Sequence, residues 1–171
     1  MDQPITIRYT WDIDEYLAAF SAHNRRALRR PSHIAILVCF LLIAIASIVA
    51  GFLEKRWWRV LLGVVLLAYQ PLSTAVVRLV LRFNYSRRPD KNRKIVWQFS
   101  PERITIESQQ NQAEFSWEAL DVVVESPKGF LLYPNQEMFY WVPKAAFPNQ
   151  DALASFTNIA GTKAPKYEVL K

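Results

Sequence analysis

The chain has 171 residues, a formal net charge of +6 and a single cysteine, Cys39, which excludes an intrachain disulfide. The positive charge is concentrated in one stretch: residues 54–94 carry ten basic and two acidic side chains, whereas residues 95–171 carry six basic and nine acidic ones. A nucleic-acid-binding protein would carry this charge on its recognition domain. The distribution therefore excludes nucleic acid as a partner.

The first predicted elements, within residues 1–31, are a strand and an amphipathic helix. Residues 5–10 alternate apolar and polar side chains, as a half-buried strand does. Asp12 and Glu15 then have the spacing of a capping box, with Asp12 as the N-cap. The helix presents an apolar stripe of Ile13, Tyr16, Leu17, Phe20 and Leu28. We expect this stripe to cover a cytosolic domain, with binding in the lipid interface as the alternative.

Two apolar runs without a charged residue follow, at residues 32–53 and 60–77. At about 1.5 Å per residue, the first forms a helix of about 33 Å, which crosses a bilayer core of about 30 Å; the second crosses if its flanks are included. Neither run has the polar face that a soluble helix needs. The sequence predicts a transmembrane hairpin over residues 32–82, with helices at 32–53 and 58–81.

Basic residues flank this hairpin on the side of both termini. Four arginines precede the first helix and seven basic residues close or follow the second, against three in the turn. The positive-inside rule therefore predicts that both termini are cytoplasmic. The seven, here called the basic collar, extend through a predicted linker at residues 83–93: Arg78, Arg82, Arg87, Arg88, Lys91, Arg93 and Lys94. We favour topology as their role, with anionic-lipid headgroup contact as the alternative.

Gln70 and Pro71 lie in the middle of the second apolar run. Proline removes a backbone donor, so a bend is predicted there. Gln70 needs a hydrogen-bond partner, because hydrocarbon offers none. We favour a local kink whose polar groups satisfy one another over a substrate path or a subunit contact.

Small residues predict close packing between the two helices. Ser47 and Gly51 lie four residues apart on the first helix, and Gly63 lies on the second. Such residues let helix backbones approach closely. We expect this packing within the hairpin, and a homo-oligomer remains the alternative.

Short alternating segments separated by turn signals fill the rest of the chain, which predicts a cytosolic antiparallel β-domain at residues 94–171. The predicted strands are residues 94–99, 103–107, 113–117, 122–125, 129–133 and 138–142. A closing helix follows at about residues 151–160, with Asn149 as its N-cap. The predicted fold class is α+β: a small β-sandwich or partly open barrel with a closing helix, to which residues 5–10 could add a seventh strand.

The chain resembles a known family at several points of this β-domain. Phe115, Trp117, the run at residues 130–133 and the segment Val142–Phe147 are similar to the C-terminal domain of YcxB-like bacterial membrane proteins. The two preceding helices and the ITIRYTWDIDEY segment are similar as well. The resemblance implies a pleckstrin-homology-like (PH-like) domain on a two-helix anchor, in a multi-pass protein of the bacterial inner membrane. It implies no assigned activity.

Catalytic and metal-binding patterns are missing from the sequence. His23 and His33 have no Cys, Asp or Glu at ligand spacing, and the four glycines form no phosphate-binding loop. We therefore predict no enzyme, no metal and no cofactor. A membrane enzyme that uses paired carboxylates is the remaining alternative.

One aromatic strand suggests a binding surface. In Phe139, Tyr140 and Trp141, alternation points Tyr140 away from the side that holds the other two. Tyr140 and Lys144 are the candidate partner surface, although a solvated charge is the favoured interpretation of Lys144. We expect a membrane-anchored adaptor module that engages a protein partner at the inner membrane face. The alternatives are an inhibitory or immunity-type protein that acts on a membrane component, and an anionic-lipid-binding module.

Overall fold

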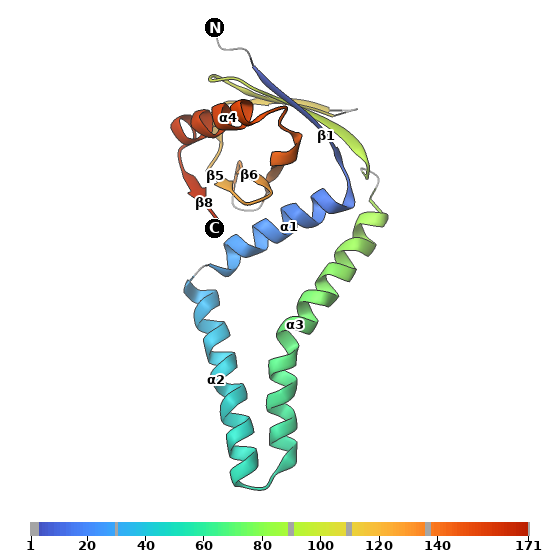
Figure 1. The fold of residues 1–171 in the computed structure, drawn as a ribbon, viewed down its shortest axis with the longest axis vertical. Coiled ribbons are helices and arrows are strands. Elements are labelled where there is room, and N and C mark those ends of the chain that lie inside the picture. Colours follow the sequence, from blue (N-terminus) through green and yellow to red (C-terminus); the bar gives the residue numbers. More distant parts are fainter. Residues whose placement is uncertain (1–3, 30, 89–90, 109–110, 136–137, 171) are drawn as a thin grey trace. The chain divides into compact units, whose positions relative to one another are not determined.

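The computed structural model describes residues 4–29, 31–88, 91–108, 111–135 and 138–170. The fold is α+β, as predicted, and its elements follow one another along the sequence as Figure 1 shows. The chain divides into two compact units. One unit joins residues 1–23 to residues 88–171, and the other comprises residues 24–87.

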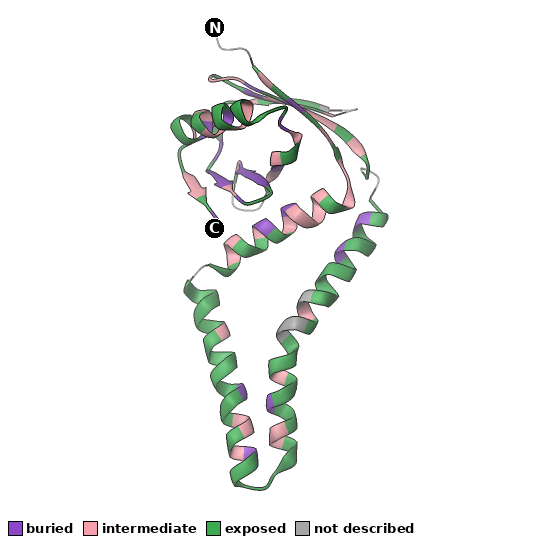
Figure 2. Cartoon of the chain, in the orientation of Figure 1, coloured by how far each residue is buried: buried purple, intermediate pink, exposed green. Residues whose placement is uncertain are grey.

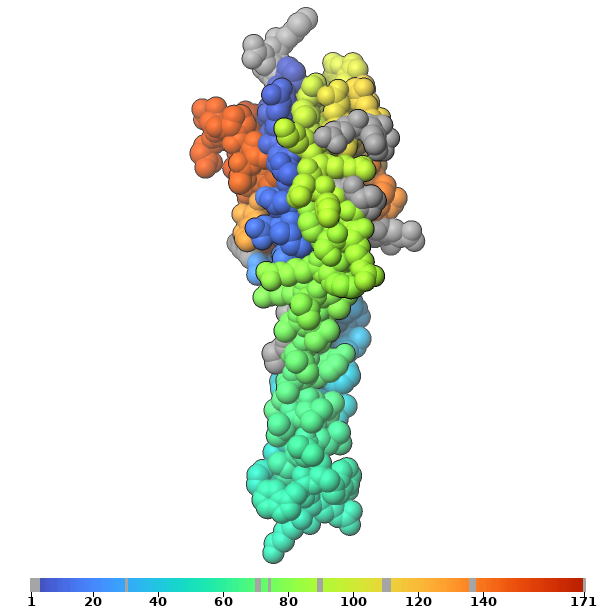
Figure 3. Space-filling view, turned by 90° about the vertical axis from the view of Figure 1, so that its right-hand side faces the viewer, coloured from blue at the N-terminus to red at the C-terminus, as the bar shows by residue number. Residues whose placement is uncertain are grey.

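The first unit contains an antiparallel four-stranded sheet in the order β1-β2-β3-β4. Its strands are β1 (Ile5–Trp11), β2 (Arg93–Phe99), β3 (Ile104–Ser108) and β4 (Asn111–Phe115). Ile7 lies opposite Trp97, which in turn lies opposite Ile106. The predicted N-terminal strand is therefore part of the β-domain, and it runs beside β2 on the face seen in Figure 3.

A second four-stranded sheet has the order β7-β6-β5-β8. It consists of β5 (Val122–Glu125), β6 (Gly129–Tyr133), β7 (Tyr140–Pro143) and β8 (Tyr167–Val169). The pairs β5–β6 and β6–β7 are antiparallel, whereas β8 runs parallel to β5. The sequence did not predict β8.

The strand predicted at residues 113–117 is too long. β4 ends at Phe115, and residues Trp117–Ala119 form a 3-10 turn instead. The Trp117 indole is 2% exposed and donates a hydrogen bond to the Ser100 carbonyl at 2.8 Å. The chain leaves the sheet at Ser116 because the side chain of the next residue, Trp117, turns into the core.

Helix α4 (Gln150–Lys163) closes the core that lies between the two sheets, as predicted. Asn149 is its N-cap and accepts a hydrogen bond from the Ala152 backbone at 2.7 Å. Phe156 sits at the centre of the aromatic core, with ring centroids 4.6 Å from Phe99 and 5.2 Å from Phe147. Figure 2 shows the burial concentrated in the strands of the second sheet.

Helix α1 (Ile13–Leu28) packs by its first part on the other face of the second sheet, around Ala19 and Ala22. The helix covers the domain as expected, but the predicted stripe is not its most buried face, because alanines bring the backbone closest to the sheet. Asp12 caps it through hydrogen bonds from the backbone of Asp14 and Glu15. Glu15 does not complete the capping box: its carboxylate accepts from Trp141 Nε1 at 2.6 Å.

The second unit contains helices α2 (Pro31–Leu53) and α3 (Trp57–Ser86). They pack closely where glycines face the partner helix. A Cβ added at Gly51 would lie 2.7 Å from Val60 Cγ2, and one added at Gly63 would lie 2.7 Å from the Ala44 carbonyl oxygen. Gly51 and Gly63 thus pack the two helices together as expected.

Among the described residues, α2 is the one helix that is long and apolar enough to cross a membrane, and the apolar stretch Trp57–Tyr69 of α3 is shorter. α3 continues to Ser86, beyond its predicted end at residue 81, so the helix takes up the first part of the predicted linker. Gln70 and Pro71 lie within α3, but their side chains are outside the described part of the structure, and so is the kink predicted from them.

A candidate ligand-binding cavity

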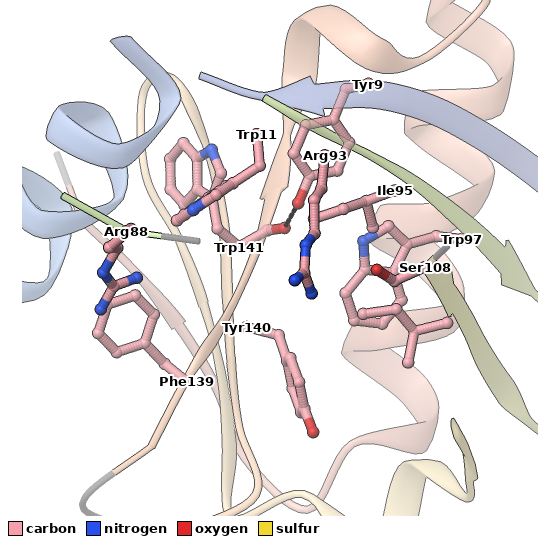
Figure 4. Close-up of a pocket in the computed structure, with 11 residues that line it drawn as sticks. Tyr9, Trp11, Arg88, Arg93, Ile95, Trp97, Ser108, Phe139, Tyr140 and Trp141 are labelled. Carbon is pink, nitrogen blue, oxygen red and sulfur yellow. Dashed lines mark hydrogen bonds between the residues drawn. The ribbon is translucent and has the colours of Figure 1, made fainter. Parts of the chain in front are cut away.

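The first unit contains a partly open cavity of about 220 Å³ between the first sheet and β7. Six aromatic residues line it: Tyr9, Trp11, Trp97, Phe139, Tyr140 and Trp141. Two arginines and three smaller side chains complete the lining: Arg88, Arg93, Ile95, Ile106 and Ser108. Figure 4 shows how most of these residues converge from β1, β2, β3 and the strand that carries Tyr140.

Strand alternation builds the wall contributed by the first sheet. Every second residue of β2 faces the second sheet, which places Arg93, Ile95 and Trp97 on one side. The register sets Trp11 opposite Arg93 and Tyr9 opposite Ile95. The cavity is thus the continuation of the hydrophobic core toward one end of the sheet.

Tyr140 forms part of the opposite wall. Its ring stacks on Phe115 at a centroid distance of 5.7 Å and meets Trp97 edge-on at 5.6 Å. Its neighbours belong to the other side of the sheet, since Trp141 packs in the cluster under α1 and Phe139 stacks on His23 at 4.9 Å. The predicted alternation is confirmed, and Tyr140 remains partly exposed rather than covered by α4.

Arg93 gives the cavity a positive charge. Figure 4 shows its guanidinium reaching into the space between Trp97 and Trp141, beside Tyr140. No carboxylate of the described residues forms an ion pair with it, and none of the described residues that line the cavity is acidic. Arg88, at the cavity edge, lies over the Tyr16 ring at 5.1 Å. The cavity therefore favours anions over cations.

Two polar groups lie within the aromatic wall. The Tyr9 hydroxyl donates to the Trp141 carbonyl oxygen at 2.6 Å, and burial raises the pKa of Tyr9 well above its ordinary value although nearby Trp97 opposes the shift. Tyr9 is thus a neutral donor at physiological pH. The Trp97 indole Nε1 is buried and makes no well-formed hydrogen bond with any of the described residues.

The structure distributes the basic collar over different surroundings. In the second unit, Arg78 and Arg82 are exposed on α3, and Arg87 lies over the Phe83 ring at 4.1 Å. In the first unit, Arg88 and Arg93 line the cavity. Lys91 and Lys94 are exposed in that unit, and Lys94 lies on the opposite face of β2 from Arg93.

Lys144 is engaged within the domain, unlike the solvated charge that we favoured. Its Nζ lies 2.6 Å from Glu125 Oε1 and 5.2 Å from the centre of the Phe130 ring. Tyr167 donates to the other Glu125 oxygen at 2.6 Å. Partial burial alone would raise the pKa of Glu125, but the hydrogen bonds from Lys144 and Tyr167 outweigh it and lower the pKa.

Sequence reasoning missed most of this cavity. The predicted strand stopped before Trp11, and Arg93 was assigned to a linker. The signal was present in β2, where Arg93 has the same period-2 phase as Trp97 and Phe99 and therefore faces the core. No group of three or more His, Cys, Asp or Glu side chains that could hold a metal gathers in the described part of the chain.

Residues 99–160 match the family model described as YcxB-like protein, which confirms the resemblance over that part of the chain. The matched segment runs from the last residue of β2 into α4 and contains Ile106, Ser108 and the aromatic residues 139–141 of the cavity. The cavity residues from β1 and β2 precede it. No curated protein and no solved structure matches the chain.

Proposed function

We propose that this chain is a multi-pass protein of the bacterial inner membrane, anchored by α2 and α3 as a hairpin, with both termini in the cytoplasm. The length and composition of α2 support it, as do the large apolar side chains exposed along both helices, such as Leu42, Leu61 and Leu72. Water would disfavour such a surface, whereas hydrocarbon would solvate it. The charge distribution supports the orientation.

Reporter fusions test this topology. A reporter that is active only in the cytoplasm should give signal after residue 171, and one that is active only outside should give signal at Lys55, in the turn between the helices. Cytoplasmic signal from both positions would contradict the hairpin.

We further propose that the β-domain, PH-like in architecture, is a binding module without catalytic activity that engages a protein partner through the aromatic cavity. The observation that carries this proposal is the cavity itself, which is lined by six aromatic residues and two arginines. Aromatic residues and arginine are the residues on which protein partners most often depend. Tyr140, half-buried at the cavity, is the contact we propose first.

Crosslinking in cells tests the binding module. A photo-crosslinking amino acid at Tyr140 should give a defined protein adduct in native membranes. The same amino acid at Thr162, exposed on α4, is the control and should not give this adduct. Identical adducts from both positions, or none from Tyr140, would contradict a partner at the cavity.

A further inference from the structure

We infer that the cavity accepts the C-terminal aromatic residue of its protein partner, with the ring held by the aromatic wall and the terminal carboxylate bound by Arg93. This inference rests on the proposed binding function of the cavity. It adds the chemical identity of the group that enters.

The size of the cavity favours a single residue. Its volume of about 220 Å³ is below the range of about 300–1,000 Å³ that drug-sized ligands occupy. This volume can enclose one ring with its backbone, and the other residues of a longer segment would lie outside the opening. A chain terminus can enter end-on, whereas an internal residue must bring its flanking backbone on both sides.

The charge of the cavity favours a carboxylate on that residue. An anion that leaves water for an apolar site needs an opposite charge and hydrogen-bond donors. Arg93 offers a planar guanidinium that binds carboxylates with two parallel hydrogen bonds. Its backbone is fixed in β2 opposite Trp11, so the side chain starts beside the cavity before any ligand binds.

The apolar wall favours an aromatic ring. Trp97 and Tyr140 already meet edge-on at 5.6 Å, a geometry that a further ring can extend, and Trp11 faces the same space. A ligand that has both a ring and an anionic oxygen complements both features of the cavity.

Short peptides binding to the full chain in lipid nanodiscs test the inference. The probe is an N-acetylated tetrapeptide of three glycines and a terminal phenylalanine, compared as the free acid and as the C-terminal amide. The same peptide with a terminal alanine lacks the ring, and N-acetylphenylalanine lacks the three glycines that precede the ring. Ligand-observed NMR, with empty nanodiscs as the blank, measures each affinity.

Two variants of adjacent residues locate the binding. R93Q removes the Arg93 charge from the cavity at similar side-chain length and leaves Arg88 in place, and K94Q removes an equal charge from the opposite, exposed face of the same strand. We expect the free acid to bind at least about tenfold more tightly than the amide, and R93Q to abolish that difference. K94Q should change the affinity by less than about twofold.

Each other result overturns the inference at a recognisable step. If the acid and the amide bind equally, the carboxylate has no role in binding, although the cavity can still be a binding site. The Tyr140 crosslink tests separately whether a protein partner binds there. Equal loss in R93Q and K94Q shows that the charge acts from a distance. Tighter binding of N-acetylphenylalanine than of the peptide assigns the cavity to a small molecule, and binding of no aromatic probe rejects the terminus altogether.

Discussion

Glu125 shows how one residue joins three segments of the β-domain. It lies on β5 and accepts hydrogen bonds from Lys144, which follows β7, and from Tyr167 on β8, both at 2.6 Å. The side chains of Lys144 and Glu125 are only 25% and 22% exposed, so water screens the pair less than a surface pair. We therefore expect this group to stabilise the edge of the second sheet.

Substitution of Lys144 by methionine should lower the free energy of unfolding by about 1–3 kcal/mol at pH 7, because Glu125 then keeps a partly buried charge with one partner fewer. The pKa of Glu125 is lowered in the folded state, so its stabilising contribution is present above the ordinary value of 4.5 and is lost as pH falls through the folded pKa. The difference between wild type and K144M should therefore shrink on acidification. Chemical unfolding followed by tryptophan fluorescence at several pH values measures it.

The matched control is Lys166, which pairs with Glu168 at 2.8 Å but has a 65% exposed side chain. K166M should cost less than about 0.5 kcal/mol, since exposed pairs contribute little. If K144M and K166M behave alike, or if the effect of K144M does not depend on pH, the Glu125 group has no special role in stability.

At the scale of elements, the glycines of α2 and α3 set how closely the helices approach. A Cβ at Gly63 would lie 2.5 Å from Ile48 Cγ1 and 2.7 Å from the Ala44 carbonyl oxygen, and backbone cannot move aside as a flexible side chain can. Gly63→Leu should therefore force the helices apart and destabilise the pair by roughly 1–3 kcal/mol.

Helix content measured by circular dichroism should then be lost at a lower proportion of SDS in mixed micelles. Val64→Leu, at a half-exposed neighbour, should leave that midpoint unchanged, and equal shifts in both variants would contradict the packing.

The elements that sequence reasoning found are those with local signals. Strands β5 and β6 have the predicted bounds, and Asp12 and Asn149 cap their helices as predicted, because alternation and capping depend on a few neighbouring residues. Strand β8 was not predicted because its three residues form a strand only through parallel pairing with β5, which is far away in the sequence. The cavity was not predicted for the same reason, since Trp11 and Arg93 become neighbours only through the pairing of β1 with β2.

At the scale of the whole molecule, the first unit is built from both ends of the chain, with the helices α2 and α3 inserted between them. β1 supplies an outer strand of the first sheet, and Ile7, 1% exposed, enters the same core as Trp97 and Phe99. The part of α1 up to His23 covers the second sheet. The predicted division at residues 1–31 and 94–171 places these two parts of one folded unit in separate segments.

A protein in which a flexible Gly/Ser linker replaces residues 24–87 should therefore fold as a soluble domain, because both parts of the unit are retained and the apolar helices are removed. A fragment that begins at residue 88 should not fold stably. It lacks β1, so it exposes the hydrogen-bonding edge of β2 and the core side of Trp97, and it lacks the helix that covers the second sheet. Size-exclusion chromatography and thermal unfolding distinguish the two proteins. The linked protein should be monodisperse and unfold in one sharp transition, whereas the fragment should aggregate or show no cooperative transition. Cooperative folding of the fragment alone would show that the N-terminal strand and helix are accessories to the domain rather than part of it.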